Sequence, residues 1–204
     1  MSNKSTKELE LVTVHELFKG RQKAVANVKA FSSADSHGPA KTIAVVNQKG
    51  GVGKTTTTIS LGASLAELGR RVLLVDFDPQ GSLSIGLGVI TDELESSIYN
   101  LLMDRNASVD DVLLKTTVPG MDLIPSDIML SGAEIGLVNE VAREQSLKRI
   151  LAPLALEYDV ILIDCQPSLG LLTVNALTAA DLILVPLQCE YFALRGFKLL
   201  KEIT

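Results

Sequence analysis

The segment that most constrains the fold of this chain is a glycine-rich stretch at residues 49–56, KGGVGKTT, which follows the apolar run IAVV at residues 43–46 after two polar residues. An apolar strand, a glycine-rich turn and a helix start in this order are typical of a loop that binds phosphate, because backbone N–H groups crowd around the phosphate oxygens. Gly50, Gly51 and Gly53 give the backbone room for that approach. The alternative is an ordinary strand-to-helix turn, which the complete Gly-Lys-Thr ending disfavours.

Two lysines and a threonine supply the chemistry of this loop. Lys54 would place a positive charge at the β- and γ-phosphates, and the Thr55 hydroxyl suits a magnesium ion. The common pattern begins with glycine at position 48, where this chain has Gln48, and Lys49 is an additional cation. The candidate nucleotide-binding residues are Lys49, Gly50, Gly51, Val52, Gly53, Lys54, Thr55 and Thr56.

Apolar strands alternate with helical segments from residue 42 onward. We expect strands at residues 42–47, 71–76, 121–124, 158–164 and 181–186. We expect helices near residues 54–68, 96–103, 127–142, 144–156, 170–179 and 192–203. This alternation predicts an α/β fold of the P-loop NTPase kind, with a parallel sheet covered by helices on both faces. Since 47% of the residues are apolar and only 4% aromatic, the core must be aliphatic.

Three aspartates follow predicted strands, at the sheet edge where ligands bind in such folds. Asp76 ends the run VLLVD and is expected near the magnesium ion, while Asp78 in the next turn could orient or deprotonate an attacking water. Asp164 ends the run VILID and matches the second nucleotide motif, whose acid binds magnesium, usually through water. Thr55, Asp76 and Asp164 are therefore the metal candidates. Solvated turn acids, and a helix cap at Asp164, are the alternatives.

Residues 1–40 are expected to be an extension of a domain at residues 41–204. Within residues 13–31 an amphipathic helix is suggested by the spacing of Val14, Leu17, Phe18, Val25 and Val28. A polar, turn-rich linker follows at residues 32–39, and we expect the extension to be flexible apart from the helix. Residues 1–41 carry seven Lys or Arg and four Asp or Glu, although the whole chain has a net charge of −5.

Composition also narrows the cellular setting. No apolar run approaches the ~20 residues of a membrane span. Lys4, Lys7 and Glu8 precede the first apolar segment, which is wrong for a secretory signal, so we expect a cytoplasmic protein without a membrane partner. Cys165 and Cys189 have no close Cys or His neighbours, which favours reduced, buried thiols over a disulfide or a metal site.

Taken together, four motifs resemble those of the ParA-type partition ATPases. These belong to the deviant P-loop group that also contains MinD and the nitrogenase iron protein. The resemblance covers about residues 41–204. It rests on QKGGVGKTTTT at residues 48–58, VDFDPQG at 75–81, DCQPSLG at 164–170 and PLQCEYFAL at 186–194.

The resemblance implies a role for each matching residue. Lys49 would cross a dimer interface to the partner's nucleotide, as an arginine finger does in trans. Lys54 and Thr55 would hold phosphate and magnesium within the chain, Asp78 would be needed for hydrolysis, and Asp164 would be the acid on the metal side. The family implies ATP and Mg²⁺, an ATP-dependent homodimer that binds DNA non-specifically, a ParB-like centromere-binding partner, and a nucleoid-associated place in the cytoplasm.

Two departures from the family pattern stand out. Gln166 stands before Pro167 where the family has two prolines, and the family's domain continues past Thr204, so the resemblance implies that the C-terminal part is missing. Three alternatives follow. One is a MinD-like or cargo-positioning ATPase of the same fold. Another is an iron–sulfur reductase with Cys165 and Cys189 as cluster ligands. The third is a binding module that holds nucleotide without hydrolysing it.

Overall fold

The computed structural model describes residues 10–11 and 38–188, and these form one sheet with flanking helices. Its seven strands run in the order β1-β7-β2-β6-β3-β5-β4. The strands are β1 (Glu10–Leu11), β2 (Lys41–Val45), β3 (Val72–Phe77), β4 (Leu114–Lys115), β5 (Met121–Ile124), β6 (Val160–Cys165) and β7 (Leu182–Leu184). The α-helices are α3 (Lys54–Glu67), α4 (Ser82–Gly86), α5 (Ile98–Met103), α6 (Leu130–Gly136), α7 (Ser146–Leu154) and α8 (Leu171–Ala179).

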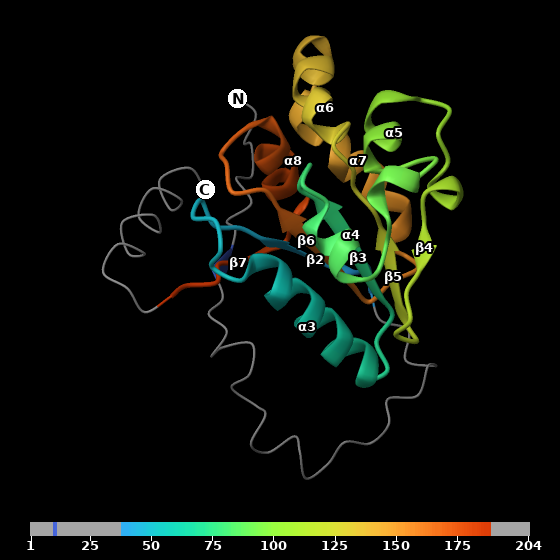
Figure 1. Cartoon of the computed structure of the whole chain (residues 1–204), viewed down its shortest axis with the longest axis vertical. Coiled ribbons are helices and arrows are strands. Elements are labelled where there is room, and N and C mark those ends of the chain that lie inside the picture. Colours follow the sequence, from blue (N-terminus) through green and yellow to red (C-terminus); the bar gives the residue numbers. More distant parts are fainter. Residues whose placement is uncertain (1–9, 12–37, 189–204) are drawn as a thin grey trace, which may run out of the picture.

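Helices cover both faces of the sheet, as the alternation of elements predicts (Figure 1). On one face α3 packs on side chains such as Leu74 and Leu162. On the other face α5, α7 and α8 pack on a larger cluster that includes Leu73 and Ile163. β3 is buried at every residue, and its successive side chains point to opposite faces of the sheet. Its apolar side chains therefore pack into one cluster or the other according to the face on which they lie. The predicted aliphatic core and the predicted fold class are confirmed.

Five expected strands and five expected helices occur within two residues of most of their predicted bounds, but three details are different. β4 is antiparallel to β5, so one edge of the sheet departs from the parallel pattern. The helix expected at 127–142 is α6 followed by a short 3-10 turn at Leu137–Asn139, since two glycines weaken this segment. Within the extension, β1 pairs in parallel with β7.

Other expectations cannot be compared with the structure. The amphipathic helix within residues 13–31 and the helix at 192–203 lie outside the described residues.

Several short elements were not predicted, because segments of three to five residues carry too little periodicity. They are the helix α4 and the 3-10 turns at Thr91–Glu93, Val109–Asp111 and Arg143–Gln145. The helices within residues 10–11 and 38–188 are too short or too polar to span a lipid bilayer.

Gly62 sets how closely α3 approaches the sheet, and this gives a first prediction. A Cβ atom at Gly62 would lie 2.8 Å from Leu74 Cδ2 and 3.1 Å from Met121 Sδ. We expect Gly62→Val to destabilise the fold by about 1–3 kcal/mol, because the added atoms overpack a closed interface. Urea unfolding followed by circular dichroism would measure the change.

The matched control is Gly132→Ala in α6, where an added Cβ meets only Tyr99 Cε2 at 3.9 Å. Alanine is the better helix former, so this variant should be neutral or more stable by up to about 1 kcal/mol. Equal stability of Gly62→Val and the wild type would show that α3 does not need this close approach.

Candidate functional site

The glycine-rich loop connects the carboxyl end of β2 to the start of α3, and its geometry explains its glycines. Gly51 has a φ of +71° and Gly53 a φ of +90°, which are left-handed values that side chains disfavour. Among the described residues, no atom lies within 4 Å of a Cβ atom added at Gly50, Gly51 or Gly53. The loop therefore borders open space at its glycines, while Val52 between them is buried.

The groups beside this space are hydrogen-bond donors, the positive end of a helix dipole and a lysine ammonium group. Within the described residues, the backbone N–H groups of Gly50, Gly51 and Gly53 make no hydrogen bond, and the positive end of the α3 dipole lies beside them. Lys54 is 92% buried, and its Nζ donates to the Lys49 carbonyl at 3.4 Å, which folds the ammonium group back over the loop. Such a loop is suited to an anion with several oxygens.

Thr55 and Asp164 meet directly beside this loop. Thr55 Oγ1 donates to Asp164 Oδ2 at 2.6 Å, and Thr58 Oγ1 lies 3.4 Å from Asp164 Oδ1. Burial raises the pKa of Asp164 to about 6, against hydrogen bonds from Thr55 and the nearby charge of Lys54, which lower it. A paired hydroxyl and carboxylate are hard oxygen donors of the kind Mg²⁺ prefers, so this pair could hold the ion.

No cluster of three or more His, Cys, Asp or Glu residues occurs in the part of the chain that the structure describes. A magnesium ion at Thr55 and Asp164 would therefore need further oxygen ligands from phosphate groups or water. This is how Mg²⁺ is usually bound in nucleotide sites. The residues present thus fit the ion together with a nucleotide, rather than as an all-protein cage.

Asp76 is placed differently from the sequence prediction. It is the register partner of Asp164 on neighbouring strands, so the two carboxylates are close, but Asp76 is fully buried inside β3 instead of standing at its tip. Ser84 donates to Asp76 Oδ2 through both its backbone N–H, at 2.8 Å, and its Oγ, at 2.7 Å. The Asp78 N–H lies 3.3 Å from Oδ1. Asp76 therefore anchors α4, and its assignment as a metal ligand stays a prediction.

The burial of Asp76 gives a pH prediction. Burial raises the pKa of Asp76 from 3.8 to about 7, although the Ser84 hydrogen bonds oppose the shift. Because the native state holds this proton more tightly than the unfolded state, the Asp76 contribution to stability is complete below 3.8 and declines as the pH rises towards about 7. Across that window the loss is of the order of 4 kcal/mol.

Asp76→Asn keeps the acceptor oxygen for Ser84 and cannot ionise. In urea unfolding at a series of pH values, we expect the stability of this variant relative to the wild type to rise between pH 3.8 and about 7. A constant difference over that range would contradict a buried, readily protonated Asp76.

Asp78 lies in the turn between β3 and α4, half-buried at the rim of the loop site. Its Oδ1 accepts from the Gln80 N–H at 2.9 Å, which closes the turn. Its negative charge is one of the causes that raise the pKa of Asp164, so the two acids are near one another. The structure therefore brings Lys54, Thr55, Asp78 and Asp164 to one edge of the sheet, as the sequence predicts.

Lys49, at the start of the loop, is exposed. Its Nζ donates to Gln188 Oε1 at 3.1 Å, while Gln188 Nε2 donates to the Gly51 carbonyl at 3.4 Å. Asn47 supports the same region, since its Oδ1 accepts from the Lys49 N–H at 2.9 Å and its Nδ2 donates to the Pro186 carbonyl at 2.8 Å. Sequence reasoning assigned no role to Asn47 or Gln188, because their partners lie up to 139 residues away.

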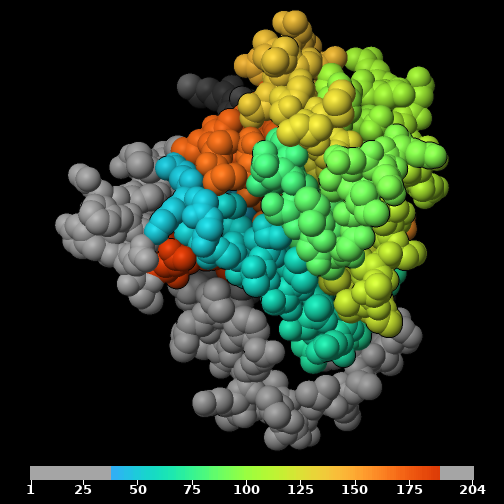
Figure 2. Space-filling view, viewed as in Figure 1, coloured from blue at the N-terminus to red at the C-terminus, as the bar shows by residue number. Residues whose placement is uncertain are grey.

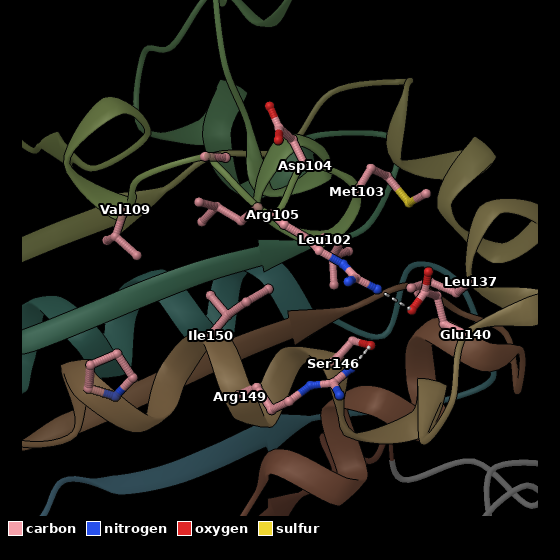
Figure 3. A pocket seen from close by; sticks show the side chains of 13 residues that line it. Leu102, Met103, Asp104, Arg105, Val109, Leu137, Glu140, Ser146, Arg149 and Ile150 are labelled. Atoms are coloured by element: carbon pink, nitrogen blue, oxygen red, sulfur yellow. Dashed lines mark hydrogen bonds and ion pairs between the residues drawn. The ribbon is translucent and has the colours of Figure 1, made fainter.

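Lys49, Gly50 and Gly51 of the loop are exposed. Figure 2 shows the start of α3, in cyan, next to the segment that leads into α8, in orange. A cavity of about 570 Å³ lies elsewhere, between α5 and α7, where Arg105 reaches Glu140 and Arg149 reaches Ser146 (Figure 3). None of the residues that line this cavity belongs to the glycine loop. The loop site is therefore distinct from this cavity.

The cysteines give no support to a cluster site. Cys165 is buried at the end of β6, and burial raises the pKa of its thiol well above the usual value, which makes it unreactive. Cys189 lies outside the described residues.

Comparison with known proteins identifies relatives over most of the chain. A family model described as an AAA domain matches residues 40–204. The sporulation initiation inhibitor protein Soj of Bacillus subtilis is 56% identical over 156 residues, which are 76% of this chain and 61% of that protein. The chromosome partitioning protein ParA of Myxococcus xanthus is 53% identical over 154 residues, covering 76% and 54%. The chain thus spans little more than half the length of these relatives.

Solved structures agree on the fold. A Mycobacterium smegmatis protein described as cobyrinic acid a,c-diamide synthase, with bound ADP and magnesium, gives a TM-score of 0.76 at 50% identity, covering 80% of this chain and 66% of that one. A complex of Cyanothece McdA with ATP gives 0.76 at 29% identity, covering 82% and 64%.

Proposed function

This chain belongs to the AAA-domain family that includes the ParA and Soj partition proteins, and we propose that it is a magnesium-dependent ATPase of DNA segregation. The observation that carries the proposal is the contact between Thr55 and Asp164, at 2.6 Å, beside a loop whose glycine N–H groups make no hydrogen bond within the described residues. The domain proposed at residues 41–204 agrees with the residues that the family model matches, and residues 1–40 would be its extension.

Binding would begin at the loop. The N–H groups of Gly50, Gly51 and Gly53 and the Nζ of Lys54 would hold phosphate oxygens, with Val52 and Thr56 contributing backbone at the same turn. The ADP and ATP bound in the related structures support a nucleotide as the ligand. Lys54 would neutralise charge near the bond that breaks, because its ammonium group is held above the loop.

Thr55 and Asp164 would hold Mg²⁺, Asp164 through a water. The ion, when bound, would offset negative charge on the phosphate oxygens. Thr58 keeps Asp164 in position, since its hydroxyl lies between that carboxylate and the Lys54 carbonyl. Asp76 would act indirectly, because it would fix the position of α4 and of the turn that carries Asp78.

Asp78 is the group proposed to act on the attacking water. It stands in a turn that is closed by the Gln80 N–H, so its second oxygen remains available to accept a hydrogen bond from water. Proton acceptance by this carboxylate would accompany attack on the γ-phosphorus, and the leaving product is ADP. Without Asp78 the loop would still bind nucleotide.

A second copy of the chain would complete the site. Lys49 is exposed beside the loop, and its ammonium group would act on the phosphates held by the partner chain. We therefore propose an ATP-dependent homodimer that binds DNA non-specifically, responds to a ParB-like partner and acts in the cytoplasm at the nucleoid. The partition names of the Soj and ParA relatives support this assignment.

The name of the Mycobacterium smegmatis structure suggests a second function, the formation of an amide on cobyrinic acid. The same loop could serve either reaction, so nucleotide binding alone does not separate them. Dependence of ATP turnover on DNA would favour partition, whereas dependence on cobyrinic acid would favour the synthase.

The direct test is phosphate release by the wild type and by Asp78→Ala, with Mg²⁺, DNA and a centromere-binding protein present. We expect measurable turnover in the wild type and a loss of at least about 100-fold in the variant, with nucleotide affinity retained. Equal turnover in the two proteins would refute the proposed hydrolysis.

A further inference from the structure

A carboxylate outside the nucleotide loop holds the segment that follows Asp164. Glu134, on α6, accepts through Oε1 from the Gln166 side-chain Nε2 and from the Leu172 backbone N–H, each at 3.3 Å. Gln166 and Leu172 flank residues 167–171, so one oxygen ties both ends of this loop. None of the three residues belongs to the site proposed for ATP.

The Leu172 N–H needs a partner from elsewhere in the fold. It lies in the first turn of α8, where N–H groups have no acceptor within the helix, and the N-cap residue, Gly170, has no side chain to supply one. The first turn of α8 also has no acidic residue of its own. Glu134 therefore caps α8 from a different helix, and its negative charge suits the positive end of the α8 dipole.

Gly170 is required by this arrangement. A Cβ atom at Gly170 would overlap Glu134 Oε1, so any larger residue there would push the carboxylate out of its present position. Its φ is −76°, so the glycine is explained by the approach of the carboxylate and not by a left-handed backbone. The loop and Glu134 are thus fitted to one another.

The other end of this segment is the acid of the second motif. Asp164 and Cys165 are the last two residues of β6 and Gln166 follows directly, so a displacement of Gln166 would act on the strand end that carries the partner of Thr55. Thr173 holds the middle of the loop independently, because its Oγ1 donates to the Ser168 carbonyl at 2.6 Å. The segment therefore has a second tie when the Glu134 contacts are lost, and α8 can remain folded.

We propose that Glu134 is a positioning residue for ATP hydrolysis: it fixes residues 166–170, and through them Asp164, at the proposed magnesium site. This inference rests on the proposed function. Glu134 touches neither the glycine loop nor Lys54, so its removal should lower the turnover rate and leave nucleotide affinity nearly unchanged.

The first arm of the test does not depend on catalysis. Amide hydrogen exchange at Leu172 reports directly on the Glu134 contact, since that contact is the hydrogen bond of this N–H group. We expect Glu134→Ala to speed exchange at Leu172 by about tenfold or more. Glu134→Gln keeps an acceptor oxygen and should restore much of the protection.

The second arm measures turnover and affinity in the same variants. We expect Glu134→Ala to lower kcat by roughly fivefold or more with the Kd for an ATP analogue within about twofold, and Glu134→Gln to recover part of the loss. Glu140→Ala removes a carboxylate that pairs with Arg105 at an exposed site, and it should change neither exchange at Leu172 nor kcat.

The outcomes separate two failures. Unchanged exchange at Leu172 in Glu134→Ala would overturn the contact, and faster exchange with unchanged kcat would overturn the positioning role. A wild-type chain without turnover would instead refute the proposed ATPase, while the exchange arm would still decide whether Glu134 holds the loop.

Discussion

Replacement of Lys54 by alanine is expected to weaken the binding of ATP with Mg²⁺ by about 100-fold or more. Lys54 is 92% buried, and its ammonium group is folded over the glycine loop by the Lys49 carbonyl. Without Lys54, no ammonium group from this position would neutralise the phosphate charge. The site is partly shielded from water, so solvent would screen that charge poorly. The N–H groups of the loop would remain, so binding should be weakened rather than abolished.

The loss of Lys54 should also be visible without nucleotide. Its positive charge is one of the causes that lower the pKa of Asp164, so the variant should hold the Asp164 proton more tightly.

A fluorescent ATP analogue titrated into the wild type and into Lys54→Ala would measure the affinity for nucleotide. Lys41→Ala, which removes an exposed lysine at the opposite end of β2, is the matched control. Equal affinities of wild type and Lys54→Ala would place the nucleotide elsewhere.

The second large effect is expected for Lys49→Ala, and it should fall on turnover instead of affinity. Lys49 is exposed, and its Nζ donates to Gln188 Oε1 at 3.1 Å. A cation that acts on the partner's phosphates contributes to the transition state only within a dimer. We therefore expect turnover to fall by roughly 100-fold to 1,000-fold.

Affinity of the Lys49→Ala variant for the fluorescent analogue should stay within about threefold of the wild type. Lys49→Arg keeps a positive charge of similar reach and should recover part of the turnover. A variant that loses affinity and turnover to the same extent would show that Lys49 binds the nucleotide of its own chain.

The sequence predicts the strands well, because each is a buried aliphatic run bounded by charged or turn-forming residues. β5 is predicted at the observed residues, but β3 extends one residue beyond its predicted end. Asp76 therefore lies inside the strand, where it is buried, and not at the strand tip near the magnesium ion as expected. Asp78 lies in the turn after β3, near the site, as expected.

The contacts that hold the site could not be predicted. Each of these contacts is a hydrogen bond between residues that are far apart in the sequence. The separations are 8 residues for Ser84 and Asp76, 38 for Glu134 and Leu172, and 139 for Lys49 and Gln188. A local motif is recognisable because the chain itself fixes its spacing. These partners are set by the packing of separate elements, and they leave no periodic signal in the sequence.

The most direct test is sedimentation velocity of the wild-type chain with Mg²⁺ and an ATP analogue that cannot be hydrolysed, compared with ADP. Lys49 acts in trans only when two chains face one another, so a shift to twice the mass of one chain is predicted with the analogue and none with ADP. A chain that binds the analogue and still sediments at the mass of one chain would contradict the proposed dimer.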